Sequence, residues 1–298
     1  MRLTVSLISE DAIMKVVIMP NLTRQNAYET MIKLCESLDI LNIEYAFLPE
    51  DDSVNEFPEG KIITAKELPY NADVLITIGG DGTMIRAAMS VLDYEIPLLG
   101  INAGNLAYLM GLEADEMILL NKLISEDYNV EERLVLQVDI FNENDNHVLT
   151  DFCINEVVLA RGAEIKLTQF DLFCDNRFIN RYNADGLIIS TPTGSTAYNL
   201  ASGGPIVDPR VDCMILSPIC PHSLVERTVI FNSDSVFRIE NPDCSIKSLL
   251  SCDGRDSIVF DRNYKAIIKK ADKKVKLIRL KDDTFMEILH KKMKTNNR

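Results

Sequence analysis

The sequence predicts two domains: an N-terminal α/β domain built on a doubly wound parallel sheet, and an all-β, sandwich-like C-terminal domain. In residues 1–128, short apolar strands alternate with helical segments, which is the pattern of a parallel sheet covered by helices. In residues 129–271, short strands follow one another with few helices, as in β-sandwiches. A chain of 298 residues is long enough to bury two such cores.

The first domain has the element order of a Rossmann-like fold. We expect its strands at residues 15–19, 43–48, 62–64, 74–78 and 97–101. Helices are expected from a cap at Asn21 or Thr23 to residue 38, at residues 84–92 and at residues 117–124. Ligands of such sheets bind beyond the carboxyl ends of the strands, and the loop after residues 74–78 lies there.

The second domain begins where polar and apolar residues start to alternate. Its first expected strands are at residues 134–140, 147–159, 167–174, 178–182 and 187–190. Further strands are expected at residues 214–217, 229–231, 236–239, 257–260 and 264–268. The chain closes with an apolar stretch at 275–280 and a helix at 283–292.

Composition is that of a soluble globular protein, with 47% hydrophobic and 26% charged residues. The formal net charge of −14 argues against binding to nucleic acid or to an anionic membrane. No apolar run approaches the roughly 20 residues of a membrane span, and charged residues interrupt any signal peptide. The seven cysteines form no CxxC pair and the three histidines lack zinc-ligand spacing, so we expect reduced thiols, no metal site of the protein's own and a cytoplasmic location.

The most informative stretch is a glycine-rich turn between an apolar strand and an amphipathic helix. It reads Gly79, Gly80, Asp81, Gly82, Thr83. Glycines allow positive φ and close approach of a ligand, and the N-terminus of the next helix attracts anions. Asp81 therefore suggests a group that handles a proton or a metal beside a phosphate. The alternative is a simple strand–helix turn in which Asp81 caps the helix.

Two polar stretches stand out in the second domain. Asn155 and Glu156 interrupt an otherwise apolar strand, so they either turn outward at a bulge or line a site. Residues 183–198 place an Asp-Gly pair before a strand and a hydroxyl-rich loop after it. Those hydroxyls suit a ribose or a base edge, and they equally suit capping of the helix that follows.

Several chemistries are excluded by the absence of their motifs. The chain has no GxxxxGK[ST] loop, no GxGxxG after a strand, and too few histidines for a Ser–His–Asp or Cys–His site. What remains is a phosphate-binding turn with an acid, together with loops suited to a nucleoside. This combination predicts phosphoryl transfer onto, or binding of, a nucleotide-like molecule.

With these motifs in order, the chain resembles the bacterial NAD kinase (ATP-NAD kinase) family. The matching segments are GGDGT at 79–83, NE at 155–156, DGLIISTPTGSTAY at 185–198, SGGPIV at 202–207, SPICPHSL at 217–224 and DG at 253–254. GGDGT is also found in lipid kinases, whereas the segment at 185–198 is specific. The resemblance extends from about residue 16 to the end of the chain.

The resemblance implies ATP-dependent phosphorylation of the 2′-hydroxyl of the adenosine ribose of NAD, giving NADP. It implies Mg²⁺ or another divalent cation with ATP, NAD as substrate, and a homo-oligomer, either dimer or tetramer. It also implies that residues 272–298 return to complete the first domain. No nucleic acid or membrane partner is expected.

The resemblance also assigns roles to particular residues. Asp81 would accept the proton of the attacking hydroxyl, with Gly82 beside the phosphates and Arg86 one helical turn further on. The residues implied to hold the dinucleotide are Asn155, Glu156, Lys166, Asn183, Asp185, Thr196, Ala197, Tyr198, Asn199, Leu200, Ala201 and Arg255.

Four positions depart from the family pattern. Ala107 and Tyr108 stand where many members have glycine and phenylalanine, Arg255 replaces glutamine, and Asn183 replaces an arginine of some members. Arg255 bears on the preference between NAD and NADH. One alternative function is a non-catalytic dinucleotide-binding regulator. Another is a lipid kinase, although the negative net charge of the chain argues against it.

Overall fold

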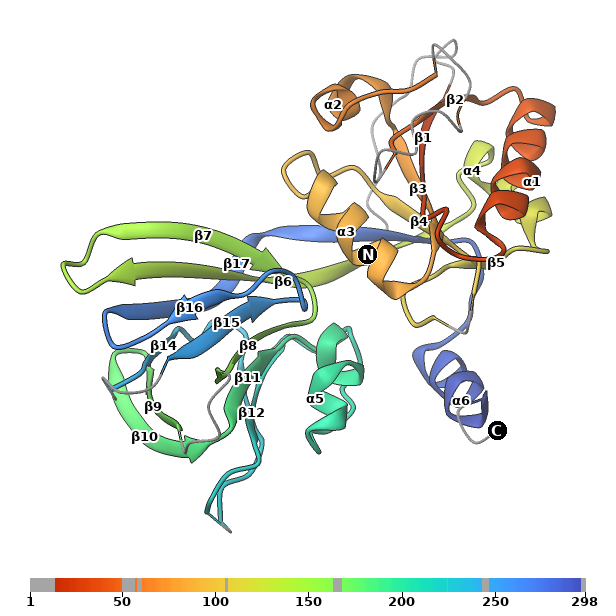
Figure 1. The fold of residues 1–298 in the computed structure, drawn as a ribbon. Helices are drawn as coiled ribbons and strands as arrows, with labels where there is room; N and C mark the ends of the chain where they lie inside the picture. Colours follow the sequence, from red (N-terminus) through yellow and green to blue (C-terminus); the bar gives the residue numbers. More distant parts are fainter. Residues whose placement is uncertain are drawn as a thin grey trace. The chain divides into compact units, whose positions relative to one another are not determined.

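The computed structural model describes residues 14–49, 57, 61–104, 107–162, 168–223, 225–242 and 247–295. The chain divides into two compact units (Figure 1). Unit 1 contains the residues up to Glu131 and those from Lys276 onward, and unit 2 contains Glu132–Val275. Strands β6 (Asn129–Asn142) and β17 (Tyr264–Arg279) run from one unit into the other.

Unit 1 is built on a parallel sheet in the order β2-β1-β3-β4-β5, in which every pair is parallel. Its strands are β1 (Lys15–Pro20), β2 (Glu44–Phe47), β3 (Val74–Gly79), β4 (Leu98–Asn102) and β5 (Leu112–Glu113). The end of β17 adds Leu277 beside Leu98, also in parallel. All residues of β3 and β4 are buried, as expected for uncharged strands covered on both faces.

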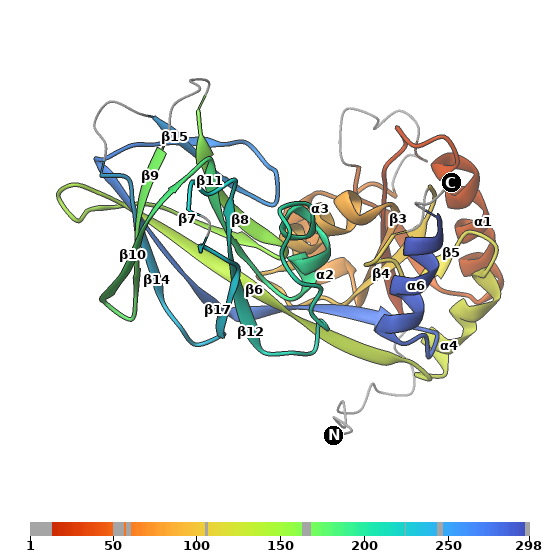
Figure 2. The same ribbon diagram turned by 90° about the horizontal axis from the view of Figure 1, so that it is seen from below.

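Helices cover both faces of this sheet, which confirms the predicted α/β class. The α-helices of unit 1 are α1 (Ala27–Ile40), α2 (Leu68–Asn71), α3 (Asp81–Val91), α4 (Asn121–Ile124) and α6 (Phe285–Thr295). Helix α1 buries Leu34 and Leu38 in a cluster with Ile18 and Ile76 of the strands. Helix α3 lies on the opposite face in both views (Figures 1 and 2), with Met84 packed against the backbone of Gly100.

Unit 2 consists of two layers of antiparallel strands, as predicted for its sandwich-like fold. One layer contains β9 (Thr168–Cys174), β10 (Arg177–Ala184), β14 (Phe237–Glu240), β7 (His147–Cys153), β6 and β17. The other runs β13 (Val229–Asn232), β12 (Cys213–Ile219), β11 (Gly186–Ser190), β8 (Glu156–Arg161), β15 (Ser248–Cys252), β16 (Ile258–Phe260). Their inner faces share one apolar core, to which Phe170 and Phe237 come from the first layer and Leu187 and Met214 from the second.

One expected strand is wrong in a way that matters for the site. The sequence predicts a continuous strand over residues 147–159, but β7 ends at Cys153 and β8 begins at Glu156. The break occurs because the N–H groups of Ile154, Asn155 and Glu156 all turn to the carboxylate of Asp253. Asn155 and Glu156 are therefore placed at a joint between two strands.

Within the described residues, no helix has the length and hydrophobicity needed to cross a membrane.

Candidate active site

The glycine turn of unit 1 joins β3 directly to α3. Gly80 is in an extended conformation, with φ −135° and ψ −171°, and the helix begins at Asp81. The positive-φ glycines of the described chain are Gly203 and Gly254, so the glycines of this turn are not there for a left-handed backbone. Gly79 is required by packing, because a Cβ there would collide with the side chain of Thr83, whereas a Cβ on Gly80 would meet nothing within 4 Å. The turn therefore has no room for a side chain at Gly79, whereas the backbone of Gly80 is accessible.

Asp81 is not the helix cap that the sequence allowed as an alternative. The cap position is Gly80, with no side-chain capping bond. The Asp81 carboxylate instead accepts the backbone N–H of Leu109 at Oδ1 (2.8 Å) and that of Tyr108 at Oδ2 (3.0 Å). Lys292 of α6 adds an ion pair to Oδ2 at 3.2 Å. Asp81 is thereby oriented by groups outside its own helix, with 29% of its side chain exposed.

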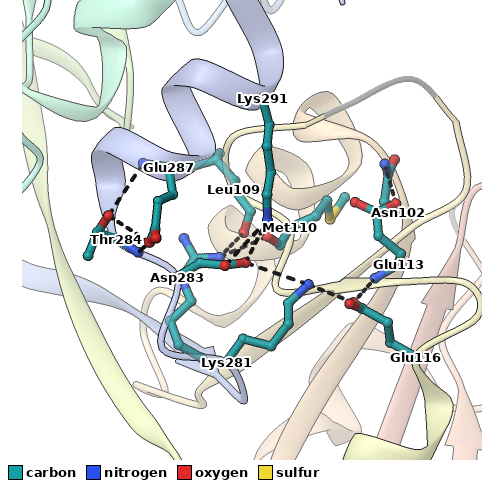
Figure 3. A network of polar contacts seen from close by, with 11 residues as sticks. Asn102, Leu109, Met110, Glu113, Glu116, Lys281, Asp283, Thr284, Glu287 and Lys291 are labelled. Carbon is teal, nitrogen blue, oxygen red and sulfur yellow. Dashed lines mark hydrogen bonds and ion pairs between the residues drawn. The ribbon is translucent and has the colours of Figure 1, made fainter.

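The segment that holds Asp81 is itself fixed by buried bonds. Arg279 of β17 donates from Nη1 to the carbonyl oxygens of Leu109 (3.0 Å) and Met110 (2.9 Å), and its Nε pairs with Glu131. Asn102, at the end of β4, donates to Glu113 at 2.9 Å (Figure 3). The loop whose N–H groups hold the carboxylate of Asp81 is therefore itself held in place by hydrogen bonds.

Arg86 lies beside the same turn. Its Nη2 donates to Thr83 Oγ1 at 3.5 Å, and its Nη1 is the nearest neighbour of the Cβ position of Gly82, at 3.8 Å. Asp81, Gly82 and Arg86 thus lie together in the first turns of α3. The arrangement offers a carboxylate, a guanidinium and a helix N-terminus to one small region.

In unit 2 the organising residue is Asp253, which belongs to the DG motif at 253–254 but was not among the predicted site residues. Its carboxylate accepts the N–H groups of Ile154 (2.8 Å), Asn155 (2.8 Å) and Glu156 (3.1 Å). Asp253 and Gly254 both have positive φ, 50° and 67°, which aims the carboxylate back at these donors. Burial raises the pKa of Asp253, and the three N–H bonds oppose that rise. The Asp-Gly pair was the signal in the sequence for this tight turn.

Glu156 is a buried carboxyl group of unit 2 with a strongly raised pKa. Its side chain is 7% exposed and its Oε2 has no hydrogen-bond partner in the structure. Burial, followed by repulsion from Asp253, raises the pKa of Glu156 to about 8, and the backbone N–H of Tyr198 opposes the rise. The carboxyl is therefore largely protonated at neutral pH and presents a hydrogen-bond donor.

The hydroxyl-rich loop is bonded to the backbone of the Asn155–Glu156 joint. Thr191 donates its backbone N–H to the carbonyl of Asn155 at 2.8 Å and its hydroxyl to the carbonyl of Ile154. Gly194 lies so close to the backbone of Asn155 that any Cβ would collide with it. The loop and the joint are thus held together by contacts of their backbones.

The residues predicted to bind from 196 to 201 differ in accessibility. Thr196 and Ala197 are half-buried, while Tyr198, Leu200 and Ala201 of the short helix α5 (Tyr198–Ala201) are exposed. Asn199 is fully buried, and its amide donates to the carbonyls of Ser195 and Pro205, both at 3.1 Å. Its Oδ1 accepts the Ser217 hydroxyl at 2.6 Å. Asn199 therefore braces the loop from inside.

Asn183 and Asp185 lie away from the Asn155–Glu156 joint. In the pairing of β8 with β11, Glu156 lies opposite Ser190 and Ala160 opposite Gly186, so Asp185 is just beyond the other end of this pair, roughly 17 Å away at about 3.3 Å per residue. There Asp185 pairs with Arg161 at 3.1 Å and Asn183 accepts a bond from Gln169 at 3.0 Å. The predicted dinucleotide residues thus form two groups.

The side chain of Arg255 forms its hydrogen bonds and its ion pair within unit 2. Its Nη2 pairs with Asp151 at 2.9 Å and donates to the carbonyl of Phe152, while its Nε donates to the carbonyl of Cys252 at 3.2 Å. These bonds tie the Asp253 turn to the end of β7. Lys166 lies outside the described residues.

In the ranges that the structure describes, no group of three or more His, Cys, Asp or Glu side chains is placed to hold a metal ion. Mg²⁺ often binds through one or two carboxylates together with substrate phosphates, so these residues fit an ion that arrives with the nucleotide.

Comparison with known proteins identifies the family. Residues 15–128 match the ATP-NAD kinase N-terminal domain and residues 154–280 the ATP-NAD kinase C-terminal domain. The NAD kinase of Lachnoclostridium phytofermentans is 34% identical over 272 residues, covering 89% of this chain and 92% of that relative. The NAD kinase of Carboxydothermus hydrogenoformans is 38% identical over 239 residues, covering 80% and 85%.

Two solved structures share the fold. A yeast NADH kinase complexed with NADH has a TM-score of 0.83 at 23% identity, covering 97% of this chain and 90% of that one. An NAD kinase from Archaeoglobus fulgidus in complex with ATP has a TM-score of 0.71 at 22% identity, covering 95% and 99%. The family models and the relatives are NAD kinases, which removes the lipid-kinase alternative. The chain belongs to the ATP-NAD kinase family.

Proposed function

We propose that this protein transfers the γ-phosphoryl group of ATP to the 2′-hydroxyl of the adenosine ribose of NAD, with Asp81 as the proton acceptor. Membership of the NAD kinase family supports the reaction. The observation that carries the role of Asp81 is its position: a braced, partly exposed carboxylate at the first residue of α3, next to the open backbone of Gly80.

The chemistry follows from that position. The ribose oxygen attacks the γ-phosphorus in line, its O–P bond forms as the bond to ADP breaks, and its proton passes to Asp81. The two backbone N–H bonds hold Asp81 in one orientation, so little reorganisation is needed when the hydroxyl arrives. Gly82 and Arg86 lie where the phosphates would approach the N-terminus of α3.

Unit 2 would hold the dinucleotide through the joint that Asp253 organises. Asn155, Thr196, Ala197 and Tyr198 offer polar atoms and backbone groups there, and a protonated Glu156 can donate a hydrogen bond to a ribose oxygen. Further dinucleotide contacts are proposed for Lys166, Asn183, Asp185, Leu200 and Ala201. Asn199 and Arg255 would act indirectly, since their side chains are bonded within the unit.

Three further expectations remain part of the proposal. Mg²⁺ or another divalent cation would be held by the ATP phosphates, and when bound it would neutralise charge on the transferred group. The resemblance to bacterial NAD kinases supports a homo-oligomer, dimer or tetramer. Free thiols at Cys35, Cys153, Cys174, Cys213, Cys220 and Cys252 support a reducing, cytoplasmic location.

The activity is tested by incubating the protein with ATP, Mg²⁺ and either NAD or NADH, followed by an NADP-specific dehydrogenase readout. Formation of NADP or NADPH supports the proposal. The ratio of the kcat/KM values for NAD and NADH gives the preference between these two substrates. Saturable binding of NAD without any product would favour a dinucleotide-binding regulator. Repeating the assay with polyphosphate measures the donor range.

A further inference from the structure

Lys292, near the C-terminal end of the described chain, lies against the proposed reacting group of unit 1. Its Nζ is 3.2 Å from Oδ2 of Asp81 and 3.3 Å from the centre of the Tyr108 ring. Lys292 and Asp81 are 211 positions apart in the sequence, and no motif of the family match includes Lys292. Lys292 is not among the residues predicted from the sequence to form the site.

The helix that presents Lys292 is firmly seated in unit 1. Thr284 and Glu287 form a reciprocal capping pair at the start of α6, with Thr284 N–H donating to Glu287 at 2.7 Å and Glu287 N–H to the Thr284 hydroxyl at 3.3 Å (Figure 3). Just before it, Lys281 pairs with Glu116 at 2.6 Å. Leu289 is 5% exposed. The helix therefore holds Lys292 at a defined place.

The ammonium group of Lys292 is largely buried and paired with a carboxylate. Its side chain is only 16% exposed, and burial lowers its pKa while Asp81 opposes that effect. A buried ion pair contributes little net stability, because desolvation cancels most of the attraction. An ammonium carries three donors, and the bond to Asp81 uses one of them. Lys292 can thus serve Asp81 and a second acceptor together.

The geometry of the transfer determines where that second acceptor would be. A base lies about 2.6–3.2 Å from the hydroxyl it deprotonates. The attacking oxygen in turn starts about 3–3.5 Å from phosphorus. A cation 3.2 Å from Oδ2 of Asp81 is therefore within reach of an equatorial oxygen of the phosphoryl group being transferred.

We propose that Lys292 is a further catalytic residue, which bridges Asp81 and the transferred phosphoryl group of the nucleoside triphosphate. This inference rests on the proposed function of Asp81. The ammonium neutralises charge on the phosphoryl oxygens during transfer and keeps the carboxylate facing the hydroxyl. The ring of Tyr108 fixes the ammonium from its other side.

The test compares Lys292→Met and Lys292→Arg with Lys291→Met as the matched control. Lys291 is the preceding residue on the same helix, is 57% exposed and pairs with Asp283, so its loss removes the same charge away from Asp81. We measure kcat, the KM values for ATP and NAD, and thermal unfolding. For Lys292→Met we expect a loss on the order of 100-fold in kcat, a raised KM for ATP and an unchanged KM for NAD.

Lys292→Arg should recover most of this loss, because it restores a cation with several donors, and Lys291→Met should stay within about twofold of the wild type. A Lys292→Met enzyme as active as the wild type would overturn the inference, and so would a faster one, which would mean that Lys292 blocks Asp81. An inactive wild type would instead overturn the proposed function. Equal unfolding temperatures of all three variants exclude a loss of folding as the cause.

Discussion

The two units each contain a carboxyl group that the proposal depends on, and their environments are opposite. The Asp81 carboxylate accepts hydrogen bonds from two backbone N–H groups, forms an ion pair with Lys292 and remains partly exposed. Glu156 is buried, one of its oxygens has no hydrogen-bond partner among the described residues, and burial raises its pKa to about 8. The difference gives the two carboxyl groups different parts in the proposed reaction: Asp81 would accept a proton, and the protonated Glu156 would donate a hydrogen bond.

The largest effect is expected at Asp81. Asp81→Asn keeps the size and one acceptor oxygen but removes the base, so kcat should fall by about 10²–10⁴-fold. The affinity for NAD, measured by calorimetry, should change little, since the dinucleotide contacts are assigned to unit 2. A matching loss of NAD affinity would assign Asp81 to binding.

Asp253→Ala should have the next largest effect, on both folding and binding. It leaves three backbone N–H groups of the Asn155–Glu156 joint without their acceptor, which should cost about 3–5 kcal/mol in the free energy of unfolding. We also expect a raised KM for NAD. Denaturant unfolding measures the first effect, with the exposed Asp256→Ala on the same loop as control. Equal stability of the two variants would contradict the organising role of Asp253.

Glu156→Gln tests the raised pKa through the pH dependence of stability. From pH 4.5 to about 8, the unfolded chain releases the Glu156 proton while the folded chain keeps it, so the stability of the wild type falls across this window. The glutamine variant lacks this fall, which we expect to be about 5 kcal/mol, since each pH unit of the window contributes about 1.4 kcal/mol. The difference between the two unfolding free energies should be constant above pH 8. Parallel pH profiles would mean that Glu156 titrates normally.

The smallest effects are expected in the glycine turn, where two neighbours should respond differently. Gly79→Ala collides with Thr83 and should destabilise unit 1 by about 1–3 kcal/mol. In Gly80→Ala the new Cβ meets no described atom within 4 Å, so unfolding should be nearly unchanged while the KM for ATP rises severalfold. If Gly80→Ala left the KM for ATP unaltered, the phosphates would not approach this part of the backbone.

Much of this arrangement could be predicted from the sequence because it depends on local patterns. The uncharged run of β3, the amphipathic face of α3 and the glycines between them specify strand, turn and helix within a few residues. The two fold classes followed from helical and strand periodicity. The contacts of the site were harder, since they join residues far apart in the chain.

Three features show where local patterns fail. The bond of Lys292 to Asp81 depends on how α6 packs, and a lysine on a terminal helix usually indicates a solvated face. The break after Cys153 depends on Asp253, about 100 positions later, taking the N–H groups that a continuous strand would use. The protonation of Glu156 follows from burial, which a polar residue in an apolar run leaves ambiguous.

The central claim is that Asp81 receives the proton during phosphoryl transfer, and single-turnover kinetics test it most directly. Steady-state kcat can be limited by product release, so the wild type and Asp81→Asn are mixed, in excess over NAD, with saturating ATP and Mg²⁺. We expect the variant to bind NAD normally and to form NADP at least about 100 times more slowly. A variant that forms NADP at more than about a tenth of the wild-type rate would contradict the account.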